Sequence, residues 1–193
     1  MTAREGAEPD PVGPPPSEQP GVPATTGRLP DAGPHASEEP PRIFASFADL
    51  IEAVGTVIGP GPWEPIEQAR VDAFAEATDD RQWIHTDPER AAKGPFGGTV
   101  AHGYLTLSLL PKLNRGLYRV AGLRAGVNYG LNRVRFPAPL RTGSVVRAVS
   151  RIDEATPLAD GALALVATVT VTARGAERPC CVAQTVSRLY PDG

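Results

Sequence analysis

Residues 99–113 read TVAHGYLTLSLLPKL and have apolar side chains on nearly every side of a helix. A helix that is apolar all round must be buried among other elements of the fold. This stretch therefore predicts a central helix that the rest of the chain covers.

Short helices are expected before the central helix. Residues 46–54 start with the capping residue Ser46 and continue with apolar positions at helical spacing. Residues 63–66 have a strand-like pattern, and residues 68–77 have one apolar helical face. The polar residues 79–98, rich in Pro and Gly, are expected to form a loop that leads to the central helix.

The C-terminal part of the chain is rich in strand signals. From residue 125 onward, three or four runs of Val, Thr, Leu and Ala are separated by Pro and Gly turn signals. We expect these runs to form an antiparallel sheet. The order of elements predicts an α+β fold in which this sheet wraps around the central apolar helix.

Residues 1–41 differ in composition from the rest. They contain half of the 22 prolines and almost no Leu, Ile or Val, so they are expected to be a disordered tail. Residues 42–193 are expected to form a single domain. The tail has a net charge of −5 and the whole chain a net charge of −3, so the domain has a net charge of about +2.

This charge balance gives no basic field of the kind that nucleic-acid binding requires. The longest apolar run, residues 162–171, is about half of the ~20 residues needed to span a bilayer. The first residues contain no apolar segment typical of a signal peptide. We expect a cytoplasmic protein that binds neither nucleic acid nor membrane.

The two cysteines, Cys180 and Cys181, are adjacent. This spacing disfavours an ordinary disulfide between them and does not match a metal-ligand motif. They are expected to be buried thiols.

Proton transfer near neutral pH has few candidate groups. Of the three histidines, His35 lies in the tail, which leaves His85 and His102. His85 follows Asp80 by five residues, and a carboxylate and an imidazole that share one water could deprotonate it. The alternative is that Asp80 only ends its helix and that His85 is a partly buried loop histidine.

A second candidate group lies at the start of the apolar helix. There, unpaired backbone N–H groups near Gly103 could receive a developing negative charge. Packing of Gly103 against another element is the alternative. His102 is expected to orient the turn or its neighbours. Ser108 could hydrogen-bond inside a pocket or be satisfied by its own helix backbone.

Two stretches resemble the MaoC-like, R-specific enoyl-CoA hydratase family: residues 80–92, DRQWIHTDPERAA, and residues 94–105, GPFGGTVAHGYL. In that family an Asp and a His five residues later activate water, and a His-Gly pair opens the helix, which matches Asp80, His85 and Gly103. The resemblance is strong over residues 63–113. Residues 128–139, NYGLNRVRFPAP, resemble the strand that follows. The family resemblance implies a hot-dog fold and a homodimer.

The chain departs from the family pattern at Gln82-Trp83, where many members have Asn-Pro. Gln82 is expected to substitute for the Asn. The Gln-Trp-Ile-His form is similar to the branch that includes nodulation-protein-N-like proteins and mycobacterial 3-hydroxyacyl-thioester dehydratases. This departure from the family pattern leaves the range of acyl substrates open.

The resemblance implies reversible hydration of a 2-enoyl-CoA to an (R)-3-hydroxyacyl-CoA in fatty-acid metabolism. The substrate would be an acyl-CoA or acyl-carrier thioester, with no metal and no cofactor beyond the coenzyme A of the substrate. Asp80 and His85 would be catalytic, and the Gly103 N–H would bind the thioester carbonyl. Gln82, His102 and Ser108 would line the substrate pocket.

Three alternatives stay open. Arg133 and Arg135 are candidates to bind the phosphates of coenzyme A, or they are strand residues that face solvent. A thioesterase of the same fold would direct its carboxylate at the carbonyl carbon. A non-catalytic acyl-thioester-binding subunit is a third reading.

Overall fold

The computed structural model describes residues 40–192. The predicted tail, residues 1–41, falls on residues 1–39 except for its last two positions; residues 1–39 lie outside the described residues, so the tail and the domain boundary at residue 41 stay predictions. No helix in the described part is long and apolar enough to cross a membrane.

Four long strands form most of the main sheet: β5 (Leu123–Arg135), β6 (Val145–Pro157), β7 (Leu163–Ala173) and β8 (Cys181–Pro191). Together with β2 (Val57–Ile58) they follow the order β2-β6-β7-β8-β5, and β3 (Glu64–Pro65) also pairs with β6. Every pairing in this sheet is antiparallel. A small parallel pair joins β1 (Arg42–Phe44) to β4 (Tyr118–Val120).

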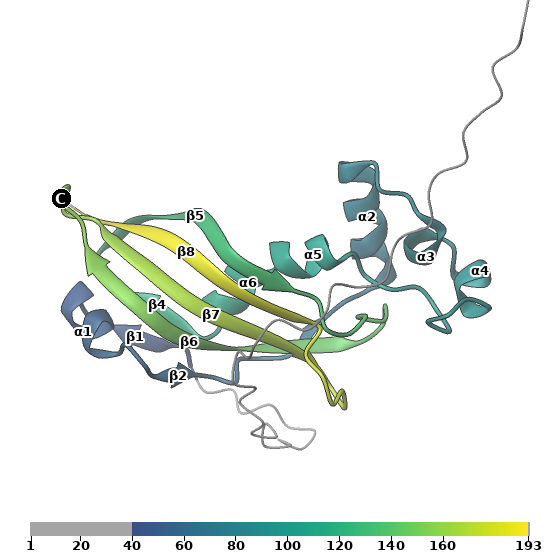
Figure 1. The fold of residues 1–193 in the computed structure, drawn as a ribbon, viewed down its shortest axis with the longest axis horizontal. Coiled ribbons are helices and arrows are strands. Elements are labelled where there is room, and N and C mark those ends of the chain that lie inside the picture. Colours follow the sequence, from purple (N-terminus) through teal and green to yellow (C-terminus); the bar gives the residue numbers. More distant parts are fainter. Residues whose placement is uncertain (1–39, 193) are drawn as a thin grey trace, which may run out of the picture. The chain divides into compact units, whose positions relative to one another are not determined.

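One face of the sheet is apolar. Along β7 every second residue from Leu163 to Val171 is buried, as expected for a strand with one face on the core. Helices α5 (Gly103–Ser108) and α6 (Leu110–Arg115) lie along this sheet and contact β8 and β6 (Figure 1). Leu105, Leu110 and Leu113 join the core cluster there. The predicted α+β arrangement of an antiparallel sheet with a central helix is confirmed.

The central helix differs from the prediction in two respects. It begins at Gly103 rather than at residue 99, and it is interrupted at Leu109. Pro111 explains the interruption, because proline has no N–H to donate to the preceding turn. One side of the helix is exposed, including Tyr104 at 71%. The prediction of a helix buried on all sides is therefore wrong for the isolated chain.

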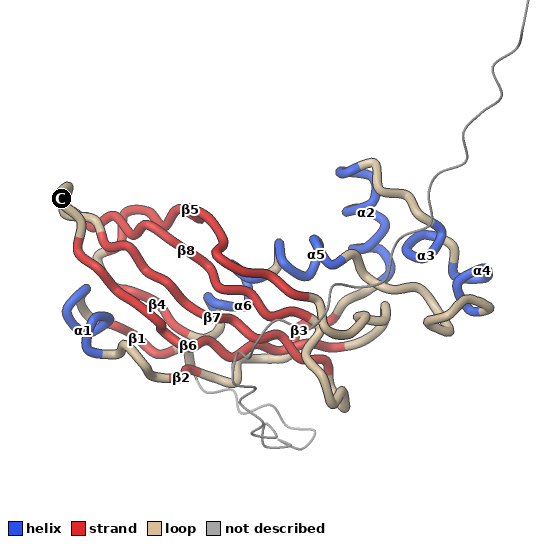
Figure 2. Tube along the Cα trace, viewed as in Figure 1, coloured by secondary structure: helices blue, strands red, loops and turns tan. Residues whose placement is uncertain are grey.

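The segment before the central helix is more helical than predicted. The expected helices are confirmed as α1 (Phe47–Glu52), capped by Ser46, and α2 (Gln68–Thr78). The expected loop over residues 79–98 contains two short helices, α3 (Trp83–Thr86) and α4 (Pro88–Ala92). Figure 2 shows α2, α3 and α4 joined by loops beyond one end of the strands. His85 therefore lies in a helix, not in a loop.

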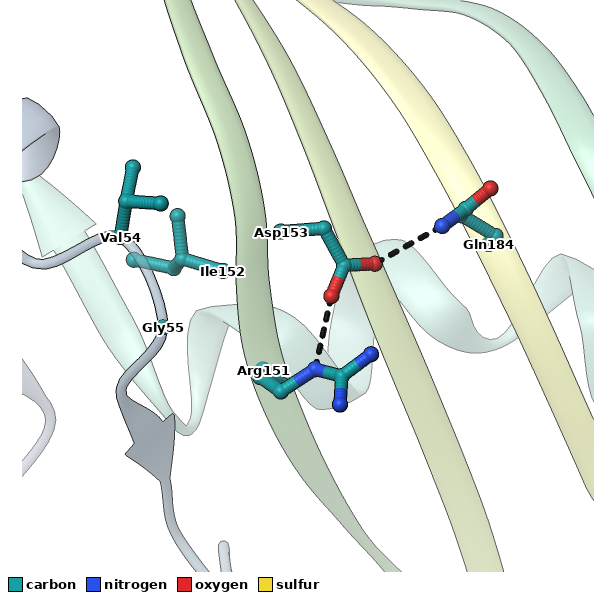
Figure 3. A pocket seen from close by; sticks show the side chains of 6 residues that line it. All are labelled: Val54, Gly55, Arg151, Ile152, Asp153 and Gln184. Atoms are coloured by element: carbon teal, nitrogen blue, oxygen red, sulfur yellow. Dashed lines mark hydrogen bonds and ion pairs between the residues drawn. The ribbon is translucent and has the colours of Figure 1, made fainter. Parts of the chain in front are cut away.

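A row of polar side chains crosses the face of the sheet opposite the core. The register of β6 shifts between Ile152 and Glu154, so Asp153 is the extra residue of a bulge. Its carboxylate accepts hydrogen bonds from Arg151 and Gln184 (Figure 3). It also accepts one from the Thr168 hydroxyl. Burial alone would raise the pKa of Asp153, but these three donors hold it below its usual value. The bulge is thereby fixed to β7, the adjacent strand, and to β8, the strand beyond it.

The two cysteines are buried and not linked to each other. Burial raises the pKa of Cys180 to about 12 and that of Cys181 to about 11. The prediction of buried thiols is confirmed.

Candidate active site

The structure brings Asp80, His85 and His102 together where α3 meets the start of α5. One oxygen or nitrogen atom from each side chain lies within 4.8 Å of those of the other two. Asp80 follows Asp79, which ends α2 in the left-handed conformation with φ of 58°. That turn reverses the chain, so that Asp80 and His85 face the same point.

The imidazole of His85 has a defined tautomer. Its Nδ1 lies 2.6 Å from the carbonyl oxygen of Val100. A carbonyl can only accept, so Nδ1 has the hydrogen and Nε2 of the neutral ring has the free lone pair. His85 can thus accept a proton or a hydrogen bond at Nε2.

The backbone of His85 is also held in place. The Gln68 amide donates to the His85 carbonyl at 2.7 Å, and the Thr99 hydroxyl donates to the Gln68 side-chain oxygen at 2.6 Å. Ile84 accepts from the Val100 N–H at 3.0 Å. Sequence reasoning missed Gln68 and Thr99. Their only sequence signal was a Gln at the start of a helix and a Thr before an apolar run, and neither points to a site.

Asp80 is more accessible than its partners. Its side chain is 42% exposed, while His85 is 7% and His102 2% exposed. The Gln82 amide donates to Asp80 Oδ1 at 3.0 Å. The residue that departs from the family pattern therefore contacts the carboxylate directly. Trp83, the other departure, lies under the Arg90 guanidinium at 4.5 Å.

Burial lowers the pKa of His85 below its ordinary value, and the neighbouring His102 lowers it further. The hydrogen bond to Val100 and the charge of Asp80 act in the opposite direction. Because the sum is a decrease, the ring is neutral at pH 7. A neutral ring is the form that can accept a proton from water.

Gly103 is the first residue of α5, and its N–H lies in the first turn, where backbone donors have no partner within the helix. A Cβ at this position would lie 3.0 Å from the Phe136 ring. The absence of a side chain therefore allows Phe136 to pack, which is the alternative considered for Gly103. The N–H stays available to a ligand.

The remaining predicted site residues are less closely connected to this cluster. Ser108 donates to the Tyr104 carbonyl of its own helix at 2.7 Å. Arg133 and Arg135 are exposed on β5, on either side of Val134, which packs on the core. Side chains alternate along a strand, so both arginines point away from the core face. Roles for Ser108, Arg133 and Arg135 in substrate binding stay predictions.

Asp80, His85 and His102 are also the described residues that come closest to a metal-ligand set. The rings of His85 and His102 are stacked, with centroids 3.7 Å apart and planes at 25°. Ring lone pairs lie in the ring planes, so those of two stacked rings do not converge on one ion as metal coordination requires. The geometry favours proton transfer over metal binding.

Comparisons with known proteins identify a matching family and similar sequences. A family model described as MaoC like domain matches residues 49–173. The chain is 49% identical over 147 residues to 3-hydroxyacyl-thioester dehydratase Z of Mycobacterium tuberculosis, covering 76% of this chain and 97% of that protein. It is 42% identical over 149 residues to Nodulation protein N of Rhizobium leguminosarum bv. viciae, covering 76% and 92%.

Solved structures show the fold. The R-hydratase PhaJ1 from Pseudomonas aeruginosa has a TM-score of 0.58 at 20% identity and covers 77% of this chain and 86% of that one. The (R)-hydratase from A. caviae has a TM-score of 0.53 at 23% identity and covers 71% and 96%. These likenesses confirm the predicted hot-dog fold.

The state of His85 can be measured directly. Because burial lowers its pKa, we expect its ring to titrate with a midpoint below 6.5. Histidine ring resonances followed by NMR against pH give this value, and a His85→Asn variant assigns the peak. A midpoint above 6.5 would contradict the neutral ring described above.

Proposed function

Because the chain belongs to the MaoC-like family, we propose that it reversibly adds water to a 2-enoyl thioester to give a 3-hydroxyacyl thioester. The observation that carries the proposal is that the Asp80 carboxylate lies close to the ring of His85, whose Nε2 has the free lone pair. The names of the two relatives and of the R-hydratases support the same reaction. From the family resemblance we extend it to an (R)-3-hydroxyacyl-CoA product and to fatty-acid metabolism.

In this reaction one water lies between Asp80 and His85. The pair removes one proton from the water, and the resulting hydroxyl adds to C3 of the substrate. The electrons of the double bond move toward the thioester oxygen, and the pair returns a proton to C2. Water is consumed and the pair ends unchanged, so the proposed step requires no metal and no redox cofactor.

Gly103 has the role of stabilising the negative charge on the thioester oxygen. Its N–H would donate to that oxygen as charge develops, and one such donor contributes about 3 kcal/mol in comparable sites. The substrate would be an acyl-CoA or an acyl-carrier thioester in the cytoplasm. Gln82 would keep the Asp80 carboxylate directed at the water.

Substitution of the carboxylate tests the reaction. Asp80→Asn keeps the shape of the side chain but removes the base, so we expect turnover of crotonyl-CoA to fall by about 10²–10⁴. The measurement is the loss of enoyl-thioester absorbance, with free thiol assayed in parallel.

Asp79→Asn is the matched control, because Asp79 is the adjacent aspartate and Asn tolerates its left-handed backbone. It should keep most of the activity. Full activity in Asp80→Asn, or release of free thiol by the unmodified protein, would refute the hydratase assignment.

We further propose that the protein works as a homodimer joined through β5. This strand is the edge of the sheet, and its residues 124–133 are all exposed. Val127, Tyr129 and Leu131 are exposed by 48%, 60% and 47%. A long apolar edge with free backbone groups is a template for pairing with another strand. Phe136, just after β5, contacts Gly103, so the interface would border the site.

A charge on this edge tests the dimer. Leu131→Lys should shift the protein toward the mass of one chain in size-exclusion chromatography with light scattering, because a desolvated lysine opposes pairing. Val57→Lys on β2, where Val57 is 63% exposed, is the control and should leave the mass unchanged. If wild type has the mass of one chain, the dimer proposal is wrong.

A further inference from the structure

His102 contacts both members of the proposed catalytic pair. Its Nε2 lies 2.9 Å from the backbone carbonyl oxygen of Asp80. Its ring stacks on His85 with a centroid distance of 3.7 Å, and Phe74 lies 5.0 Å away, tilted by 53°. At 2% exposure the ring is buried, which favours the expected role of orienting its neighbours over that of lining the substrate pocket.

The hydrogen bond to Asp80 defines the tautomer of His102. The Asp80 carbonyl can only accept, so Nε2 of the neutral ring donates, and Nδ1 has the lone pair. Nδ1 is buried and has no hydrogen-bond partner among the described residues. Nε2 also lies 3.9 Å from Asp80 Oδ2, so the contacts of this ring are with Asp80 and His85, and they support a contribution through positioning.

His102 is itself firmly held. It is the N-cap residue of α5, and its carbonyl accepts from the Thr106 N–H at 3.2 Å. The preceding Ala101 donates to the Leu140 carbonyl at 2.8 Å. Asp80, in contrast, lies in the connection between α2 and α3, and its side chain is partly exposed. The rigid residue therefore restrains the less rigid one.

We infer that His102 is a positioning residue, which holds the Asp80 backbone and the His85 ring in register with each other and with the Gly103 N–H. This inference rests on the proposed hydratase function for its kinetic consequence. It explains why the histidine stands directly before the oxyanion glycine: one side chain at the start of α5 connects all three groups. Asp80 and His85 need not touch each other to be aligned.

Three substitutions separate the two contacts. His102→Gln places an amide N–H near the position of Nε2, so it can still donate to Asp80. His102→Asn places its amide near Nδ1, so it cannot. His102→Phe keeps a ring against His85 but has no donor.

We expect kcat with crotonyl-CoA to fall about 100-fold in His102→Asn and His102→Phe, with KM within about twofold of wild type, because misplacement of a catalytic group by about 1 Å costs this much. His102→Gln should recover at least tenfold over His102→Asn. Activity near wild type in all three variants would overturn the inference, as would equal losses in Gln and Asn. A raised KM at unchanged kcat would indicate substrate contact instead.

A second measurement does not depend on activity. Asp80-Arg81 is the only Asp-Arg pair in the sequence. Carbonyl-¹³C aspartate combined with ¹⁵N arginine therefore gives one NMR correlation, which reports the Asp80 carbonyl. Its ¹³C shift should move in His102→Asn and His102→Phe and stay near wild type in His102→Gln.

If the shift is the same in all variants, the Asp80 contact is absent and the inference fails. If the shifts change as expected while wild type hydrates no enoyl thioester, the proposed function fails and the structural contact stands.

Discussion

The site depends on the hydrogen bond between His85 Nδ1 and the Val100 carbonyl, at 2.6 Å. This bond fixes which ring nitrogen is free and thereby decides that His85 can act on water. It also joins the helical segment α2–α4 to the strand-like residues that lead into α5. A second hydrogen bond, from the Val100 N–H to the Ile84 carbonyl, joins the same two segments, so Val100 both accepts from and donates to the segment that contains His85. Without this junction the Asp80–His85 pair and the Gly103 N–H would belong to separate, loosely connected segments.

The sheet and the site have different sources of stability. The sheet is held by alternating apolar residues on its core face and by the hydrogen-bonded Asp153 bulge on the other. The site segment packs few large apolar side chains and relies on polar contacts such as Gln68 with His85 and His102 with Asp80. Buried polar contacts of this kind are directional, so they can set the orientation of reacting groups where apolar packing cannot.

The sequence predicted those elements whose signals are local. The capped helix α1, the amphipathic helix α2 and the alternating strands follow from periodicity, and the Asp80–His85 spacing was recognisable from the family motif. The short helices α3 and α4 were missed because four or five residues give too little periodicity to distinguish a helix from a polar loop. The contacts of Gln68 and His102 join residues 17 and 22 positions apart, and no local pattern encodes such pairs. The central helix was predicted to be buried on all sides, but in a single chain one of its sides, which includes Tyr104, is exposed.

In the proposed reaction one water site, between Asp80 and His85, supplies both the hydroxyl and the proton to the same face of the substrate. Hydration of crotonyl-CoA in D₂O, with the product examined by ¹H NMR, tests it most directly. We expect a single diastereomer in which the deuterium at C2 and the hydroxyl at C3 were added syn. An anti product, or a mixture of both diastereomers from the start of the reaction, would contradict it.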